Sequence, residues 1–424
     1  MQPRHRNTRR FLLTLGVLLL LCGVAGASDW PRFRGPNGAG IAADKNVPVK
    51  WTTDNILWKT AIPGVGHSSP IVHAGRVYLQ SSSTDGKERW LLSLDAVKGD
   101  LVWKTPAPGR KARIHPRNSL ASSTPATDGE RVYAVFWDGK DIHLAAYDCK
   151  DGKPIWEKNL GGFKSQHGVG HSPMLIDGKV ILADDQDGAS HLFAFDARSG
   201  EKAWEVERKA FRTCYSTPFV RAKMDGDKEL IVASTAGITG YNPADGKANW
   251  SYKWSFARMP LRTVASPIAA NGLVFANSGD GAGDRHLIAV KLGDKGDVSD
   301  TNLAWENRKA FPYVPCLLVR GDHLYSVTDK GMAACHVAAS GEEVWSNRLG
   351  DAFTASPILV DGKIYAAAED GSVYVFEAAS KFNLLAKNTI GESIFSTPAV
   401  ADDHLFIRGD KHLFCIGKAA NKGR

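Results

Sequence analysis

The sequence predicts an all-β fold, an eight-bladed β-propeller with four-stranded antiparallel blades. Two repeated markers and a strand count predict it. The first marker is an acidic or turn residue, a Gly four residues later and a Trp four residues after that. It occurs at Asp95-Gly99-Trp103, Asp148-Gly152-Trp156, Asp196-Gly200-Trp204, Asn242-Gly246-Trp250 and, with Val in the lead, Val337-Gly341-Trp345. A fixed internal period is typical of a repeat architecture.

The second marker is a Ser or Thr directly before a Pro. It occurs at Ser69-Pro70, Thr124-Pro125, Ser172-Pro173, Thr217-Pro218, Ser266-Pro267, Ser356-Pro357 and Thr397-Pro398, and Val314-Pro315 fills the one gap. Successive Pro residues lie 41 to 55 residues apart. This spacing suits one four-stranded sheet per unit, so the eight units predict eight blades.

Each element of a unit has a local signal. The Pro opens the first strand, where its missing N–H is tolerated. A tight hairpin turn follows, such as Asp177-Gly178 in the third unit, because Asp-Gly accepts the positive φ that such a turn needs. The second strand is apolar, such as Val132–Val135 in the second unit. A second Gly turn leads to the third strand, which runs into the Asp-x-x-x-Gly turn. The fourth strand carries the Trp, and no convincing helical period interrupts the pattern.

The strand count predicts how the ring closes. The last unit, from Pro398 to about Gly417, has only three strands, whereas the strand at Ile56–Lys59 precedes the first unit. Pairing the two completes the eighth blade and leaves no open sheet edge. The Trp of each fourth strand is expected to be buried between blades, with its N–H on a backbone carbonyl. These residues are Trp58, Trp103, Trp156, Trp204, Trp250, Trp305 and Trp345.

The N-terminus is typical of a secretory signal peptide at residues 1–27. Four Arg precede an apolar run over residues 11–21, and Ala25-Gly26-Ala27 offers a cleavage site. The run is shorter than the roughly 20 residues that span a bilayer, so the mature chain is expected to have no transmembrane helix. We therefore expect an exported protein, periplasmic or extracellular after cleavage. Its parts would be a lead-in at 28–50, the propeller at 51–418 and a basic tail at 419–424.

Charge and cysteine content exclude several function classes. Four of the 53 Lys and Arg lie in the leader, which leaves 49 against 45 Asp and Glu, a net charge of only +4. A nucleic-acid partner is therefore not expected. Five mature cysteines are scattered over different units with no paired spacing. We expect them to be small buried hydrophobes, and the protein to be a monomer.

These markers resemble those of the PQQ-type propeller superfamily over roughly Trp51 to Lys418. The segment from Trp30 to Gly38 is similar to the lead-in of many exported PQQ-like propellers. The resemblance implies the eight-bladed fold. It leaves two functions open, because the superfamily includes both quinoprotein dehydrogenases and BamB-type protein-binding scaffolds.

A site is expected where the loops before each Pro meet at one end of the channel. The candidates for ligand binding are His67, Arg117, Asn118, His171, Arg212, Arg262 and Tyr313. Three arginines at one mouth favour an anion, because a cleft of one sign focuses its field. Two other interpretations stay open. The histidines could hydrogen-bond backbone only, and the arginines could form a structural ion ring with Asp351 and Glu392.

The resemblance also implies an enzymatic alternative, a PQQ-dependent alcohol or sugar dehydrogenase with calcium. The adjacent Cys pair of such enzymes is missing, and their calcium-holding Glu, Asn and Asp have no clear counterparts on the expected channel loops. The acidic turns at 184–188 and 280–284 are expected to be solvated hairpin tips rather than calcium loops. No catalytic residue, metal ligand or cofactor is therefore assigned. The sequence favours a non-catalytic scaffold that binds a protein, a glycan or an anionic small molecule at the loop face.

Overall fold

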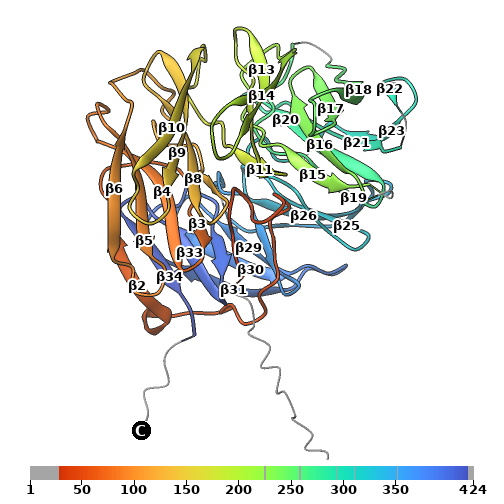
Figure 1. Cartoon of the computed structure of the whole chain (residues 1–424). Coiled ribbons are helices and arrows are strands. Elements are labelled where there is room, and N and C mark those ends of the chain that lie inside the picture. Colours follow the sequence, from red (N-terminus) through yellow and green to blue (C-terminus); the bar gives the residue numbers. More distant parts are fainter. Residues whose placement is uncertain are drawn as a thin grey trace, which may run out of the picture.

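The chain forms a ring of eight β-sheets, and neighbouring sheets follow one another in sequence order (Figure 1). The structure is a computed structural model that describes residues 28–418 except 224–225, 257–258, 294, 310 and 351. The expected signal peptide at 1–27 and the basic tail at 419–424 lie outside the described residues. The predicted all-β, eight-bladed propeller is confirmed.

Blades one to four use consecutive strands. Blade one holds β3 (Ile71–His73), β4 (Arg76–Ser82), β5 (Arg89–Asp95) and β6 (Leu101–Ala107). Blade two holds β7 (Ala126–Thr127), β8 (Arg131–Trp137), β9 (Asp141–Asp148) and β10 (Pro154–Gly162). Blade three holds β11 (Met174–Ile176), β12 (Lys179–Asp184), β13 (Ser190–Asp196) and β14 (Lys202–Arg208). Blade four holds β15 (Phe219–Ala222), β16 (Lys228–Ser234), β17 (Gly237–Tyr241) and β18 (Ala248–Lys253), with β22 (Gly296–Asp297) added to its outer edge.

Blades five to seven follow the same plan. Blade five holds β19 (Ile268–Ala270), β20 (Leu273–Gly279), β21 (Arg285–Lys291) and β23 (Leu303–Asn307). Blade six holds β24 (Leu318–Arg320), β25 (His323–Val327), β26 (Met332–Val337) and β27 (Glu343–Arg348). Blade seven holds β28 (Ile358–Val360), β29 (Lys363–Ala367), β30 (Ser372–Glu377) and β31 (Leu384–Thr389), and β1 (Ile41–Ala42) of the lead-in pairs with its inner strand.

The eighth blade combines the two ends of the propeller. It holds β32 (Ala399–Ala401), β33 (His404–Arg408), β34 (His412–Ile416) and, on the outside, β2 (Ile56–Ala61). β2 runs antiparallel to β34, with Trp58 opposite Cys415. This is the pairing that the strand count predicts, and it leaves neither strand with an open edge on that side.

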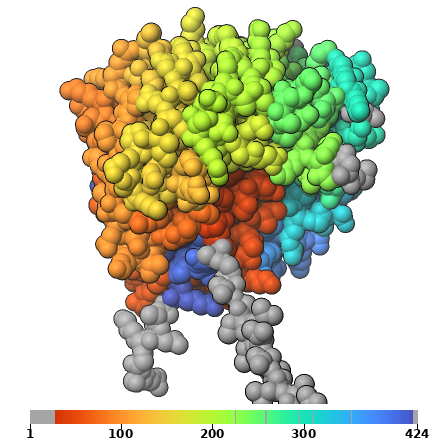
Figure 2. Space-filling model, viewed as in Figure 1, coloured from red at the N-terminus to blue at the C-terminus, as the bar shows by residue number. Residues whose placement is uncertain are grey.

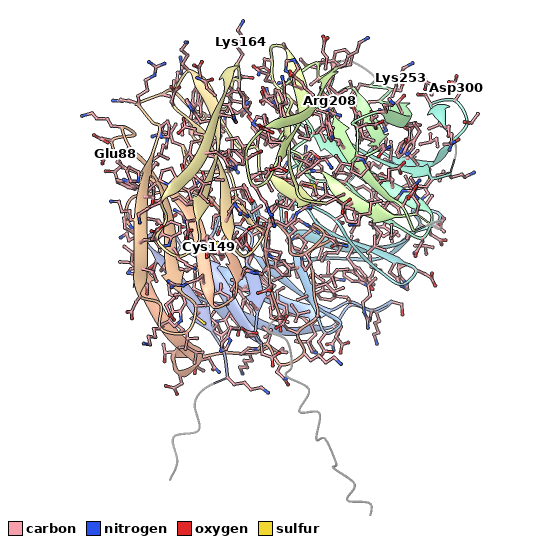
Figure 3. The ribbon with its side chains drawn as sticks, in the orientation of Figure 1. Glu88, Cys149, Lys164, Arg208, Lys253 and Asp300 are labelled. Carbon is pink, nitrogen blue, oxygen red and sulfur yellow. The ribbon has the colours of Figure 1, made fainter. Side chains whose placement is uncertain are left out.

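Neighbouring blades are joined by the Trp of one blade and the turn of the next. The Trp103 Nε1–H donates to the carbonyl of Cys149, labelled in Figure 3, at 3.1 Å, and a Cβ at Gly152 would lie 2.7 Å from the Trp103 ring. Five other Trp donate in the same way to the next turn: Trp58, Trp156, Trp204, Trp305 and Trp345. In the five of these turns that contain the repeat Gly, a Cβ would lie 2.6–2.7 Å from the indole, so the Gly lets the ring pack flat on the turn.

Trp250 is the exception among the seven. Blade five has no Asp-x-x-x-Gly turn, so the Trp250 Nε1–H donates within its own blade to Glu229 Oε2 at 3.1 Å. Gly240 leaves room for the indole, because a Cβ there would lie 2.2 Å from Trp250 Nε1. The strand β22 covers the outer edge of β18 instead.

The residues before the inner strands form a hydrogen-bonded ring around the channel. Seven backbone N–H groups donate at 3.0–3.2 Å to a side chain of the following blade: Ser69 to Thr124, Thr124 to Ser172, Thr217 to Ser266, Ser266 to Cys316, Cys316 to Ser356, Ser356 to Thr397 and Thr397 to Ser69. These bonds involve eight residues, one before each inner strand, and seven of their side chains accept; we call the eight residues the inner ring. In blade six the sequence interpretation was wrong by two residues, because Cys316 and not Val314 takes the ring position.

The lead-in at 28–50 crosses the end of the ring opposite the channel mouth. In Figure 2 its red atoms lie in the middle of the facing surface, bordered by later parts of the chain. Trp30 pairs with Val72 of blade one, and Arg32 donates to the carbonyl of Pro218 in blade four at 2.7 Å. Arg34 donates to the carbonyl of Leu317 in blade six at 2.6 Å. The lead-in therefore ties together blades that are far apart in sequence.

Candidate functional site

The channel encloses a cavity of about 320 Å³ on the ring axis. Phe33 of the lead-in lines it, and so do seven of the eight inner-ring residues, all but Ser266. One end is the mouth, where the loops entering blades one, two, three and six contribute side chains. The mouth residues that line the cavity are His67, His115, Arg117, Asn118, His167 and Tyr313. The lead-in, the inner ring and the mouth loops therefore all contribute to the cavity.

Four of the seven predicted site residues line this cavity. Arg117 is 75% exposed at the mouth, and its guanidinium lies 3.4 Å from Glu369. Asn118 is held in place, because its Nδ2 donates to the carbonyls of His167 and Val169 at 2.9 and 2.8 Å. Tyr313 also lines the mouth, and Arg285 lies over its ring. Of these side chains, Arg117 is the one best placed to meet a partner in solvent.

His67 is the fourth of these residues. Its imidazole stacks on Phe395 with ring centroids 4.7 Å apart. Burial, with a smaller contribution from the nearby Arg408 cation, lowers the pKa of His67 to about 4. The side chain is therefore neutral at physiological pH.

The other three predicted residues do not line the cavity, and Arg212 is half-buried on the loop beside Phe211. His171 is buried, and its Nε2 lies 3.2 Å from the carbonyl oxygen of Asp185. Arg262 is 2% exposed and donates to Gln166 Oε1 at 3.1 Å. Arg212 donates to the carbonyl of Pro260 at 3.3 Å. Burial, followed by the charges of Arg262, His115 and Arg212, lowers the pKa of His167 to about 4.

The expected ion ring does not form with Glu392. That carboxylate pairs with Lys59 at 3.1 Å and with His412 at 2.5 Å, at the seam of blade eight. Asp351, the other expected partner, lies outside the described residues. Within the described ranges, Arg117 is the one member of the arginine trio that forms an ion pair, and its partner is Glu369.

The structure adds residues that sequence reasoning did not assign to the site. His115 and His167 stack across the mouth with centroids 4.6 Å apart, and Tyr215, Phe395 and Phe33 line the cavity. His167 precedes the Gly-Val-Gly-His run of blade three, which was a usable signal. No sequence signal identifies Phe33, because its position in the cavity depends on how the lead-in crosses the ring.

The sequence-based prediction for one of the two acidic turns was wrong. The turn at 184–188 was expected to be a solvated tip, but Asp184 and Asp185 are buried. Asp185 forms two hydrogen bonds with Arg208, at 2.9 and 3.1 Å, and burial raises the pKa of Asp184. Figure 3 labels Arg208 in this part of blade three. The turn at 280–284 is largely exposed, as expected.

The donors around the cavity do not fit a calcium-bound quinone. Asp329 is the one acidic side chain among the residues that line it, and it already accepts from the N–H groups of Tyr313 and Val314 at 2.6 and 3.0 Å. Calcium takes six to eight oxygen ligands, several of them carboxylates. Within the described ranges, no group of three or more His, Cys, Asp or Glu side chains is arranged to hold a metal ion. All five described cysteines are free and buried.

A second hollow lies on the same face, at blade four. It has a volume of about 350 Å³ and lies between the end of β18 and the connection from β14 to β15. Its lining includes Lys209, Phe211, Tyr252 and Trp254. We call it the blade-four groove. Phe211 is 62% exposed at its edge.

Similarity to known proteins identifies the family of this chain. A family model described as outer membrane protein assembly factor BamB matches residues 39–168, 119–347 and 302–381, which together cover most of the chain. The chain belongs to this family. The part matched runs from the lead-in to the third strand of blade seven.

Individual relatives are distant. The chain is 25% identical to outer membrane protein assembly factor BamB of Bordetella pertussis over 318 residues, which are 69% of this chain and 73% of that protein. It is 27% identical to quinohemoprotein alcohol dehydrogenase ADH IIB of Pseudomonas putida over 120 residues, only 28% of this chain and 16% of that enzyme.

Solved structures share the fold. BamB from Moraxella catarrhalis superposes with a TM-score of 0.59 at 14% identity, over 87% of this chain and all of that one. The europium-containing methanol dehydrogenase gives a TM-score of 0.67 at 11% identity, over 91% of this chain and 90% of that one. At these identities the likeness shows the architecture alone. None of the helices in the described ranges has the length and apolar character to cross a membrane.

Proposed function

We propose that this propeller is an exported, non-catalytic binding protein that engages a protein partner through its loop face. The observation that carries the proposal is an exposed Phe at the blade-four groove and an exposed Met on the loop that is hydrogen-bonded to it. Phe211 is 62% exposed and Met259 is 58% exposed. The two loops that carry them are joined, because Arg212 donates to the carbonyl of Pro260. Exposed aromatic and Met side chains next to a hollow are typical of the centre of a protein interface.

The charge at this rim indicates what kind of segment would bind. Lys209 lines the groove, and Arg212 follows Phe211 directly. Within the described chain, neither forms an ion pair. A partner segment with apolar side chains for the groove and acidic side chains beside them would satisfy both features.

The channel mouth extends the proposed surface. Arg117, His67, Asn118 and Tyr313 would contact a partner that covers the mouth, with Arg117 as the exposed cation. Arg212 would meet the partner at the rim beside Phe211, Arg262 would act through its charge from behind the wall, and His171 would hold the loop. A glycan or an anionic small molecule at the mouth is the alternative ligand, and the experiment below separates these classes.

The compartment and the pathway are part of the proposal. The basic and apolar leader indicates export, and two of the relatives are outer membrane protein assembly factors. We propose that this protein works outside the cytoplasmic membrane, on proteins that pass through the envelope.

Site-specific photo-crosslinking in cells tests the proposal. A photoreactive residue at Phe211 should give discrete protein adducts of defined mass, whereas one at Val97 should not. Val97 is the matched control, since it is 79% exposed on an outer turn of blade one. Combined Phe211→Ala and Met259→Ala substitutions should abolish the adducts formed from a photoreactive residue at Arg117. Equal labelling from positions 211 and 97, or no protein adduct from the loop face, would refute a protein partner and favour the small ligands.

The alternative of a PQQ-dependent dehydrogenase has one observation in its favour, the similarity to quinohemoprotein alcohol dehydrogenase over 120 residues. The purified protein can be titrated with PQQ and calcium and assayed for dye-linked oxidation of alcohols and sugars. We expect neither tight quinone binding nor oxidation, because the cavity lacks the carboxylate set described above. Submicromolar PQQ binding with turnover would overturn the scaffold proposal.

A further inference from the structure

The inner ring presents hydroxyl protons to the axial cavity. Ser69, Thr124, Ser172, Ser356 and Thr397 line the cavity, and each side-chain oxygen accepts one backbone N–H at 3.0–3.2 Å. None of the described residues accepts a hydrogen bond from these five hydroxyls. Since a hydroxyl has one proton to donate, each is left with a donor for whatever occupies the cavity. Accepting an N–H also strengthens the hydroxyl as a donor.

Buried cations stand directly behind this ring. Arg32, Arg34 and Arg408 are at most 4% exposed. They donate to the carbonyls of Pro218, Leu317 and Ser68, each of which is bonded in sequence to a ring residue. No carboxylate of the described chain lies within ion-pair distance of the three guanidiniums.

These cations are incompletely satisfied. Arg32 Nε, Arg34 Nη1 and Arg408 Nε are buried without a hydrogen-bond partner within the described chain. A buried charge is costly unless it is paired and hydrogen-bonded. The one acidic side chain in the lining, Asp329, lies 3.5 Å from Arg285 and accepts two N–H groups, so it offsets little of this charge.

We propose that the axial cavity binds a compact oxyanion, a carboxylate, phosphate or sulfate group, held by these five cavity-lining hydroxyls in the field of the three arginines. The site lies below the mouth and does not depend on the protein partner proposed above. A volume of about 320 Å³ is at the lower end of the range of ligand sites, which fits a small anion rather than a polymer.

The ring supplies variants that keep its hydrogen bonds. Cys316 already holds a ring position in which its sulfur accepts the Ser266 N–H. Ser356→Cys should therefore preserve the ring while replacing a strong donor with a weak one. Cys316→Ser makes the opposite change at the neighbouring position. Ser266→Cys is the matched control, because Ser266 accepts the Thr217 N–H in the ring and is not among the residues that line the cavity.

Calorimetric titration of the full mature chain with phosphate, sulfate and acetate, at constant ionic strength set with chloride, tests the site. We expect saturable 1:1 binding of at least one anion, weakened about tenfold by Ser356→Cys, strengthened by Cys316→Ser and unchanged by Ser266→Cys. Comparing phosphate and sulfate with acetate shows whether the site prefers a tetrahedral oxyanion or a carboxylate. Thermal unfolding without anion checks that each variant is folded.

Two outcomes overturn the proposal. If none of the three anions binds saturably, the ring donates to water only. If Ser266→Cys weakens binding as much as Ser356→Cys, the effect is structural and the cavity is not the site. Loss of protein crosslinking at Phe211 with anion binding intact would refute the partner and leave this site standing.

Discussion

At the residue scale, the mouth shows how burial sets the charge of a histidine. His67 lies against Phe395 and near Arg408, and its pKa falls to about 4. In the unfolded chain a His titrates near 6.5. Between these two values the unfolded state binds the proton more readily, so the His67 contribution lowers stability as the pH falls from about 6.5 to about 4.

Replacing His67 with Phe tests whether His67 lowers the stability of the fold as the pH falls. The ring stack is kept, and the described chain accepts no hydrogen bond from the imidazole that the change would remove. We expect the loss of unfolding free energy between pH 7 and pH 4 to be about 2 kcal/mol smaller in His67→Phe than in the wild type, after allowance for partial solvent exposure. Denaturant melts at both pH values measure it. An unchanged difference would show that His67 is freely protonated in the folded state.

Sequence patterns predicted residues whose partners are fixed by the repeat. Six of the seven Trp on the fourth strands dock on the following turns with the expected N–H to carbonyl bonds, because the repeat presents a similar turn to the indole. Residues whose role depends on several blades were not predictable. Cys316 replaces a hydroxyl of the ring two residues after the expected position, and Asp185 is buried because Arg208 reaches it from the end of β14.

The candidate site was predictable only in part, for the same reason. Reading the loops before each Pro located Arg117, Asn118, His67 and Tyr313 at one mouth. It could not distinguish them from His171 and Arg262, which lie one layer behind. Loop side chains one residue apart can face the channel or the neighbouring blade, and the packing between blades decides which.

At the scale of the element, the Asp-x-x-x-Gly turn is the joint between blades. Gly152 has φ of +72°, and a Cβ there would lie 2.5 Å from Thr105 Oγ1 and 2.7 Å from the Trp103 ring. Gly178 has the same φ of +72° in a hairpin turn, and nothing lies within 4 Å of its Cβ position. The two positions separate backbone strain from contact with the indole.

Ala substitutions at the two glycines should therefore differ. We expect Gly178→Ala to lower the free energy of unfolding by about 1 kcal/mol, the cost of the left-handed backbone. Gly152→Ala should lower it by about 2–4 kcal/mol, because the added methyl also displaces Trp103. Chemical denaturation of the two variants measures the difference. Equal losses would mean that the turn shifts freely away from the indole.

The lead-in is the element that the sequence described least. Its similarity to other lead-ins did not identify the residues that it contacts. Its hydrogen bonds run to carbonyls in blades four and six through Arg32 and Arg34. Such contacts join residues that are more than 180 positions apart, and no local pattern encodes them.

At the scale of the whole molecule, stability depends on one seam. β34 is the third strand of blade eight, and its residues Leu413, Phe414, Cys415 and Ile416 are at most 1% exposed. Their removal would expose a large apolar area and free the edges of β2 and β33.

A chain that ends at Gly409 tests the seam, with a chain that ends at Lys418 as its control. The shorter chain should unfold at least about 10 °C lower than the full chain, or associate by exchanging strands between copies. The control should match the full chain, because it keeps every strand. Light scattering and thermal unfolding distinguish these results. A monomeric shorter chain with an unchanged transition would show that closure contributes little.

Under the export proposed above, in which the N-terminus leaves the cytoplasm first, the seam also sets an order of events. β2 emerges early and must wait until β34, some 350 residues later, has followed it. During that interval its edge is open to any other chain in the same state. Secretion rate and local crowding would thus govern whether rings form singly or interlink, and a chaperone that shields the first ribbon would act at the most vulnerable moment.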